Sequence, residues 1–244
     1  MPQVIYAHRG ASGYAPENTL EAFELAAKQN AFGVELDVHI CKSGELVVAH
    51  DETIDRVSNG SGRIADMTWK ELRSYNFNKM HPEYEKGTLL TLEEVYELLY
   101  PTGLYVNVEM KNSVIDYENL EARCAEAAAK TGMTDRVMYS SFNHYSLLRM
   151  KAIDKNAPCG LLYHATLYEP WNYARTLQVD ALHPHQSELR VPGEVEAAHR
   201  LGIEVNPWTV NTEADLRYAI NIGADRIITN YPDVALKLLK EIKG

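Results

Sequence analysis

Short apolar runs rich in β-branched residues alternate along the chain with longer stretches in which apolar residues recur at helical spacing. The short runs at 4–8, 33–39 and 45–49 predict strands. Further strands are predicted to begin near Leu104, Arg136, Cys159, Asp180, Ile203 and Asp225. The last five of these starts lie 21 to 23 residues apart. This spacing is typical of βα units, in which parallel strands are joined by right-handed helical crossovers.

Signals for helix ends fit the same division. The sequences at 18–21 and 91–94 have the form of capping boxes, which open helices. Gly132, Gly202 and Gly223 each stand shortly before a predicted strand, where glycine supplies the left-handed conformation that ends a helix. The helices are therefore expected between consecutive strands.

The runs at 33–39 and 45–49 are too close together for a crossover helix, so they predict an antiparallel hairpin. If Ser43 and Gly44 are its two turn residues, His50 stands opposite Asp37. Directly opposite residues share a face of the sheet, so His50 is expected beside Asp37.

Without the return strand of this hairpin, eight βα units remain, which is the arithmetic of a (β/α)₈ TIM barrel of about 250 residues. We expect one domain over residues 1–244, with a small insertion after the hairpin at about 51–90. An open doubly wound sheet is the alternative. It is disfavoured because no glycine-rich phosphate loop follows the first strand in the required pattern.

The composition is that of an ordinary globular protein, with 45% hydrophobic and 24% charged residues. A net charge of −10 disfavours nucleic acid and anionic membranes as partners. No apolar run is long enough to span a bilayer, and residues 1–4 do not resemble a secretory signal, although an upstream signal could have been removed. Three scattered cysteines suit a reducing compartment, so a cytoplasmic location is expected. The sequence carries no signal of oligomeric state.

Carboxylates gather at the strand ends where a barrel places its active site. Glu35 and Asp37 are two residues apart and share a face, and Glu109 belongs to the next barrel strand. Three buried like charges need protons or a shared cation, and a hard divalent ion such as Mg²⁺ or Ca²⁺ prefers oxygen ligands. The alternative is that they point outward and pair with lysines, but outward positions of barrel strands face helices and are usually apolar.

Basic and aromatic residues accompany these acids. His8 and Arg9 end the first strand, and Lys111 shares a face with Glu109. Together with His50 they suit acid–base chemistry on a phosphate ester, with one histidine as base, the other as acid, and the cations neutralising phosphoryl oxygens. Trp208 follows another strand and is equally compatible with core packing and with an apolar wall of the site.

The chain also resembles a known family, the glycerophosphodiester phosphodiesterases, and most closely their short single-domain bacterial or cytoplasmic form. The matching segments, in chain order, are His8-Arg9-Gly10, Pro16-Glu17-Asn18-Thr19, Glu35-Leu36-Asp37, His50-Asp51, Glu109-Met110-Lys111, Trp208-Thr209-Val210-Asn211 and Thr229-Asn230-Tyr231-Pro232. Each segment alone is weak, but the ordered set runs through nearly the whole chain.

The resemblance implies a metal-dependent TIM-barrel enzyme that hydrolyses small glycerophosphodiesters to sn-glycerol 3-phosphate and an alcohol. It implies three groups of site residues in this chain: Glu35, Asp37 and Glu109 as metal ligands; His8 and His50 as the acid–base pair; Arg9, Lys111 and Trp208 as substrate contacts. The nucleophile is left open between water and the glycerol 2-hydroxyl, and so is the assignment of acid and base.

Two other functions stay open at this stage. One is a lysophospholipase D-type or phospholipase-like phosphodiesterase on the same barrel, which the lack of a long apolar segment disfavours. The other is a non-catalytic binding module, because fold alone does not determine function. Such a module is expected to have lost a histidine or an acid, and this chain keeps them all.

Overall fold

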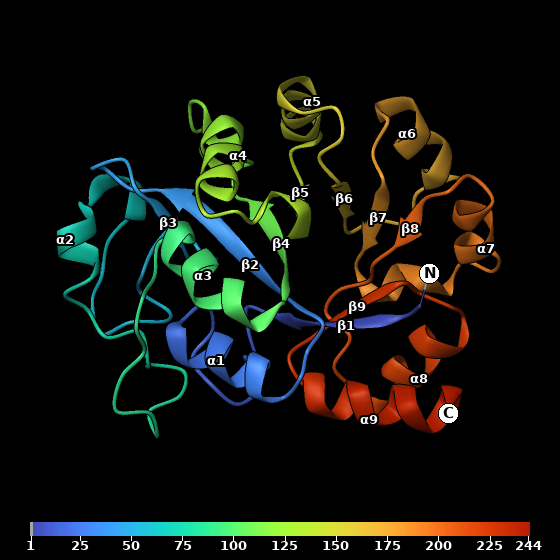
Figure 1. Ribbon diagram of the computed structural model, residues 1–244, viewed down its shortest axis with the longest axis horizontal. Coiled ribbons are helices and arrows are strands. Elements are labelled where there is room, and N and C mark those ends of the chain that lie inside the picture. Colours follow the sequence, from blue (N-terminus) through green and yellow to red (C-terminus); the bar gives the residue numbers. More distant parts are fainter. Residues whose placement is uncertain (1) are drawn as a thin grey trace.

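The computed structural model describes residues 2–244, and its elements alternate as the sequence predicts (Figure 1). The strands are β1 (Val4–His8), β2 (Gly33–Ile40), β3 (Leu46–Val48), β4 (Tyr105–Met110), β5 (Val137–Ser141), β6 (Cys159–Tyr163), β7 (Ala181–Pro184), β8 (Glu204–Val205) and β9 (Arg226–Thr229). The α-helices are α1 (Leu20–Lys28), α2 (Trp69–Leu72), α3 (Leu92–Leu99), α4 (Leu120–Lys130), α5 (His144–Ile153), α6 (Pro170–Leu177), α7 (Glu194–His199), α8 (Glu213–Asn221) and α9 (Pro232–Lys243). Short 3₁₀ helices are η1 (Ile64–Asp66), η2 (Tyr100–Thr102), η3 (Thr134–Arg136) and η4 (Gln186–Arg190).

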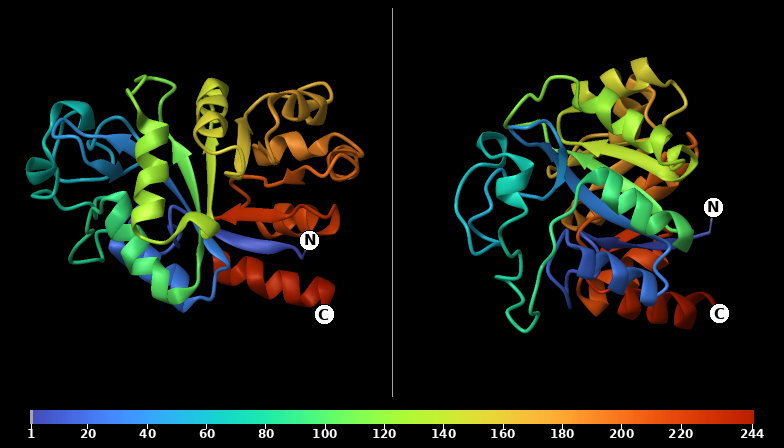
Figure 2. Two further views of the ribbon diagram at one scale, coloured as in Figure 1. Left: turned by 45° about the horizontal axis from the view of Figure 1, so that its top comes forward. Right: turned by 60° about the vertical axis from the view of Figure 1, so that its left-hand side comes forward.

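Eight of the described strands form a nearly closed parallel barrel in the order β8-β7-β6-β5-β4-β2-β1-β9. The two ends of this order are joined by backbone hydrogen bonds from Asp225 to the Val205 carbonyl (2.8 Å) and from Val210 to the Ile228 carbonyl (2.9 Å). Figure 2 shows the helices arranged around the strands. The predicted (β/α)₈ TIM barrel is confirmed, and the doubly wound alternative is wrong because the sheet curls back on itself.

Strand pairing determines which side chains share the inside of the barrel. The register places Asp37 beside Glu109 and His8 beside Glu35. Intervening apolar residues such as Leu36 and Val38 are fully buried in the main apolar core, against the helices. Side chains alternate along a strand, so Glu35 and Asp37 on β2 point into the barrel while Leu36 and Val38 pack against the helices.

Most helix ends follow local sequence. Both halves of the capping box at Thr91 are formed, and Gly132, Gly202 and Gly223 have left-handed φ values. The capping box expected at 18–21 has Asn18 as its N-cap, but α1 is capped one residue later, by Thr19. The Glu21 carboxylate, which a capping box would turn back on its own helix, instead accepts hydrogen bonds from the backbone and hydroxyl of Thr88.

The predicted hairpin forms, but its predicted register is wrong by one residue. Cys41 donates to the Glu45 carbonyl, so three residues lie in the turn, with Gly44 at φ +105°. The backbone carbonyl of Asp37 therefore accepts from the backbone N–H of Ala49, and His50 is not its partner in the hairpin. His50 follows β3 in a bend, where the alternation of the strand no longer determines its direction.

The segment between β3 and α3 packs against this hairpin. It contains η1 and α2, and its apolar side chains form a second cluster with Cys41, Val47 and Ala49. All three cysteines of the chain are buried and free. Among residues 2–244 no helix combines the length and apolar character needed to cross a membrane.

Candidate active site

The side chains predicted to form the site converge on one pocket of about 240 Å³ at the carboxyl ends of the strands. Its walls include His8, Arg9, Glu35, His50, Glu109 and Trp208. Asp37 and Lys111 adjoin these walls, because Asp37 forms an ion pair with Arg9 and Lys111 forms one with Glu109. The structure thus brings together all eight predicted residues, although they are spread from residue 8 to residue 208.

The three carboxylates form the centre of this arrangement. One oxygen from each of Glu35, Asp37 and Glu109 lies within 4.8 Å of the others, and all three side chains are buried. Among the described residues, Oδ1 of Asp37 has no hydrogen-bond partner. This buried oxygen accepts no hydrogen bond, lies 3.8 Å from the Lys111 ammonium and faces two more acids, an environment that a hard divalent cation stabilises.

Burial and neighbouring charges shift the pKa values of these three acids in different directions. Burial, reinforced by the charges of Asp37 and Glu109, raises the pKa of Glu35 well above its ordinary value. Burial also raises the pKa of Glu109, with Lys111 opposing it. Burial acts on Asp37 in the same direction, but the charges of Arg9, His50 and Lys111 outweigh it and lower the pKa of Asp37. Without a cation, Glu35 and Glu109 therefore hold protons more readily than an ordinary glutamate, whereas Asp37 stays ionised.

The His8 ring is held in one orientation at the end of β1. Its Nδ1 lies 2.7 Å from Oδ1 of Asn230, which can only accept, so Nδ1 carries the proton. The Nε2 lone pair is then free, and Nε2 lies 3.8 Å from a Glu35 oxygen. Burial and the charge of Arg9 lower the pKa of His8 to about 3. His8 is therefore a neutral imidazole with an available acceptor nitrogen.

The His50 ring is held through different contacts. Nδ1 lies 2.6 Å from Oδ1 of Asp51, and Asp51 is in turn paired with Arg56 at 2.7 Å. The His50 carbonyl lies 3.1 Å from Nε2 of the buried His39, whose other nitrogen contacts the Tyr117 hydroxyl. The Asp51 carboxylate therefore orients the His50 ring through Nδ1. The two histidines of the pocket thus differ in their electrostatic surroundings.

The cations of the site are tied to its acids. Arg9 is paired with Glu17 at 3.0 Å and with Asp37 at 3.3 Å. Lys111 lies 2.9 Å from a Glu109 oxygen and 3.8 Å from one of Asp37. These pairs partly compensate the buried negative charge and place two positive groups next to the pocket.

Several supporting residues received no role from sequence reasoning. Asn18 donates to Asp37 at 2.9 Å, and Arg56 joins Glu17 to Asp51. The motif segments of the sequence include four of these residues but do not indicate their contacts: Glu17, Asn18, Asp51 and Asn230. Nothing around Arg56 distinguishes it in the sequence, because it reaches the site from the segment after the hairpin.

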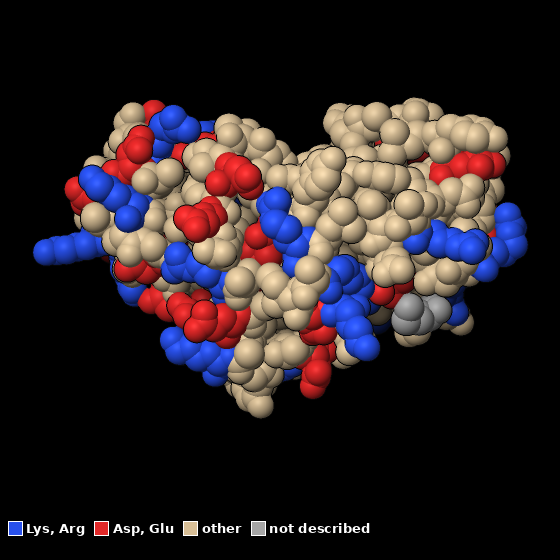
Figure 3. Space-filling view, turned by 90° about the horizontal axis from the view of Figure 1, so that it is seen from above, with Lys and Arg blue, Asp and Glu red and all other residues tan. Residues whose placement is uncertain are grey.

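An aromatic wall closes the other side of the pocket. Trp208 donates through Nε1 to the His183 carbonyl at 2.9 Å, and Phe142 meets its ring edge to face at 5.5 Å. Figure 3 shows charged side chains gathered over the half of the molecule that carries β2, β3 and α2, with a broad uncharged surface over the half that carries α6 and α7. The site therefore has a charged carboxylate side and an aromatic side.

Comparisons with known proteins agree with this geometry. Residues 8–234 match the sequence profile of the "Glycerophosphoryl diester phosphodiesterase family". A glycerophosphodiester phosphodiesterase of Caldanaerobacter subterraneus subsp. tengcongensis is 37% identical over 99% of both chains. One of Bacillus altitudinis is 36% identical over 98% of this chain and 99% of its own.

A solved structure supports the same relation. A phosphodiesterase of Oleispira antarctica, in complex with the product sn-glycerol-3-phosphate, is 30% identical. It superposes with a TM-score of 0.91 over 98% of this chain and 97% of its own. The profile match and the close relatives extend over almost all of the sequence, including every residue that surrounds the pocket. The chain therefore belongs to the glycerophosphoryl diester phosphodiesterase family of enzymes.

Proposed function

We propose that this protein hydrolyses small glycerophosphodiesters to sn-glycerol 3-phosphate and an alcohol. The observation that carries the proposal is the pocket itself, in which a neutral His8, a carboxylate-paired His50 and three acids face one another. The Oleispira antarctica relative is bound to sn-glycerol-3-phosphate, which supports the same product here.

We propose Glu35, Asp37 and Glu109 as ligands of one divalent ion, Mg²⁺ or Ca²⁺. The Asp37 oxygen that accepts no hydrogen bond and the closeness of the three carboxylates support this assignment. When bound, such an ion supplies positive charge that stabilises the phosphoryl oxygens and keeps the carboxylates ionised. Arg9 and Lys111 add two positive groups at the same edge, where they contact the phosphate.

The two histidines divide the proton transfers. His8 is proposed as the base, because its Nε2 lone pair is free to take the proton of the nucleophile, either water or the glycerol 2-hydroxyl. His50 is proposed as the acid, because Asp51 engages its Nδ1 at 2.6 Å and leaves Nε2 to donate to the leaving alcohol. Trp208 provides the apolar wall for the carbon face of glycerol.

We also propose a single barrel domain, a cytoplasmic location and small-molecule partners. The nine buried residues of the second apolar cluster include three from the hairpin region, which supports 51–90 as an insertion within one barrel domain. Three free, buried cysteines support a cytoplasmic location. The acidic net charge of −10 supports small molecules, and neither nucleic acid nor inserted membrane, as partners.

The test is a substrate panel read by release of sn-glycerol 3-phosphate. We expect turnover of glycerophosphocholine and related diesters in Mg²⁺ or Ca²⁺, loss of turnover in excess chelator, and loss in His8→Ala. Faster turnover of a lysophospholipid than of glycerophosphocholine would support the lysophospholipase D alternative. Absence of turnover on the whole panel, with metal binding intact, would support a binding module.

A further inference from the structure

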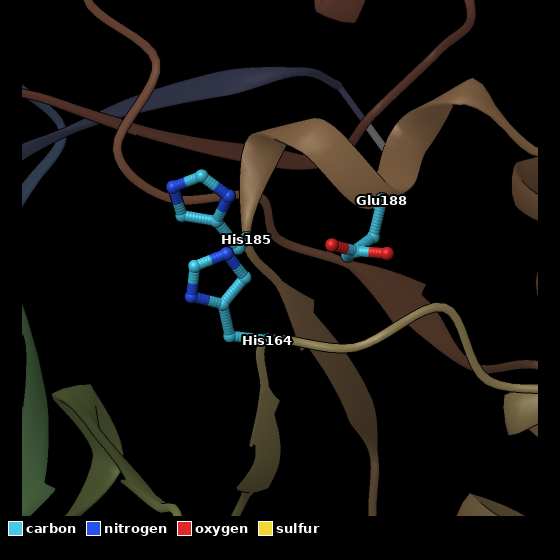
Figure 4. Close-up of side chains that lie close together, drawn as sticks. All are labelled: His164, His185 and Glu188. Atoms are coloured by element: carbon cyan, nitrogen blue, oxygen red, sulfur yellow. The ribbon is translucent and has the colours of Figure 1, made fainter.

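A second group of possible metal ligands lies at the same end of the barrel, outside the eight site residues. His164 directly follows β6, His185 directly follows β7, and Glu188 belongs to η4 (Figure 4). One ligand atom from each of these side chains lies within 4.8 Å of the others. Both imidazole rings meet Trp208 edge on, at 6.2 and 5.2 Å between ring centres. The group therefore borders the aromatic wall of the pocket and not its carboxylate side.

We propose that His164, His185 and Glu188 form a second metal site, which takes a divalent transition ion of the Zn²⁺ class. Two imidazole nitrogens and one carboxylate oxygen are ligands that Zn²⁺ prefers, whereas Mg²⁺ and Ca²⁺ prefer an all-oxygen set. The two clusters of this protein thus differ in ligand chemistry as well as in position. With three protein ligands, the new site keeps one tetrahedral position for water.

Contacts around the three ligands resemble the outer shell of a metal site. The Glu188 oxygens accept from the Thr166 hydroxyl at 2.7 Å and from the Ser187 hydroxyl at 2.9 Å. The Ser187 hydroxyl also lies 2.7 Å from Nδ1 of His185. Such second contacts orient ligands and tune their basicity, and their loss typically costs about 10–100-fold in metal affinity. The carboxylate therefore has both oxygens oriented by neighbouring hydroxyl groups.

Ion binding requires a small rearrangement of the rings. The imidazoles of His164 and His185 are stacked, with centres 4.0 Å apart and planes at 29°, so their lone pairs run side by side. The rings must turn for these lone pairs to converge, and His164 is exposed and free to do so. Binding is therefore expected to break the stack and to change the surroundings of Trp208.

The experiment is calorimetric titration of the full chain with Zn²⁺ in excess Mg²⁺, with tryptophan fluorescence recorded in parallel. We expect one Zn²⁺ site and a fluorescence change in the wild type. His164→Ala and His185→Ala should each weaken Zn²⁺ binding by about 10-fold or more, and Thr166→Val by about 10-fold. His164 is exposed, so its variant tests the ligand role without disturbing the core.

Two matched controls separate this site from others. His199→Ala removes a histidine that lies beside one carboxylate, Asp225, and it should bind Zn²⁺ as the wild type does. Glu35→Gln disables the carboxylate site and should leave Zn²⁺ binding in excess Mg²⁺ unchanged. The proposal is overturned if Zn²⁺ does not bind, if binding survives in both His164→Ala and His185→Ala, or if Glu35→Gln abolishes it. None of these readouts depends on turnover, so the result stands apart from the proposed enzymatic activity.

Discussion

Replacing Glu35 with glutamine should stabilise the metal-free protein while weakening the proposed metal site. Glu35 is buried with Asp37 and Glu109, and one oxygen of each lies within 4.8 Å of the others. Glutamine has the same size and keeps an oxygen that can accept from the Arg9 backbone, as Glu35 does at 3.2 Å. The substitution therefore removes a charge with little change in packing.

Two considerations set the size of the effect. At 4.8 Å and an effective dielectric constant of about 20, one pair of like charges repels by about 3.5 kcal/mol. Loss of the attraction to Arg9 opposes this gain. We expect a net stabilisation of about 2 kcal/mol near pH 7, which corresponds to about 4–8 °C in Tm for a chain of this size.

The gain should depend on pH, with a definite sign. Burial and the neighbouring acids raise the pKa of Glu35 in the folded state, so the folded protein holds a proton that the unfolded chain releases. The wild type therefore loses stability as pH rises from the ordinary glutamate pKa through the raised value, by up to about 1.4 kcal/mol per pH unit. Glu35→Gln has no such loss, so its advantage should be small near pH 4.5 and grow towards neutrality.

The assay is calorimetric unfolding in chelator at several pH values, repeated with Mg²⁺ or Ca²⁺. The exposed Glu126 provides a control, and Glu126→Gln should follow the wild type throughout. Added metal should raise the Tm of the wild type more than that of Glu35→Gln, because the variant lacks one proposed ligand. A Tm difference that stays constant with pH, or an equal effect of metal on both proteins, would refute this account of the three carboxylates.

Four further predictions concern the proton transfers. In steady-state kinetics, His8→Ala and His50→Ala should each lower kcat/KM by about 10²–10⁴-fold, with little change in Tm. The double variant should lose much less activity than the product of the two single effects. A nitrophenyl diester, whose leaving group hardly needs an acid, should partly rescue His50→Ala and not His8→Ala; equal rescue of both would exclude the assigned roles. Asp51→Asn should lower kcat more than it raises KM in steady-state kinetics, because the His50 ring loses the carboxylate that orients it. The acid limb of the wild-type pH–rate profile should lie well below pH 6.5, since burial and Arg9 lower the pKa of the proposed base His8 to about 3.

Local sequence determined the order of the elements and the face of each strand. The 21- to 23-residue repeat of strand starts, the glycines that end helices and the capping box at Thr91 all act within a few residues, so they could be interpreted without the fold. The spacing of Glu35 and Asp37 placed both on one face because side chains alternate along a strand. Eight βα units then determined which strand ends meet at one rim.

Tertiary structure decided what local spacing leaves open. The hairpin has a turn of three residues where two were expected. This difference of one residue makes Ala49, and not His50, the cross-strand partner of Asp37. His50 reaches the pocket from the bend after β3, where His39 contacts its carbonyl and Asp51 its ring. The position of His50 thus depends on contacts beyond the strand and not on the pairing of the hairpin.

The same limit applies to residues that meet only after the barrel closes. Arg56 joins Glu17 and Asp51 across 39 and five positions of sequence, and the stacked His164 and His185 come from consecutive strand ends. No periodicity encodes such contacts, because the rotamers and loop paths that produce them are determined by packing against distant segments. The sequence alone therefore predicted which residues gather at the rim, whereas the folded chain decided the partner, the protonation and the orientation of each.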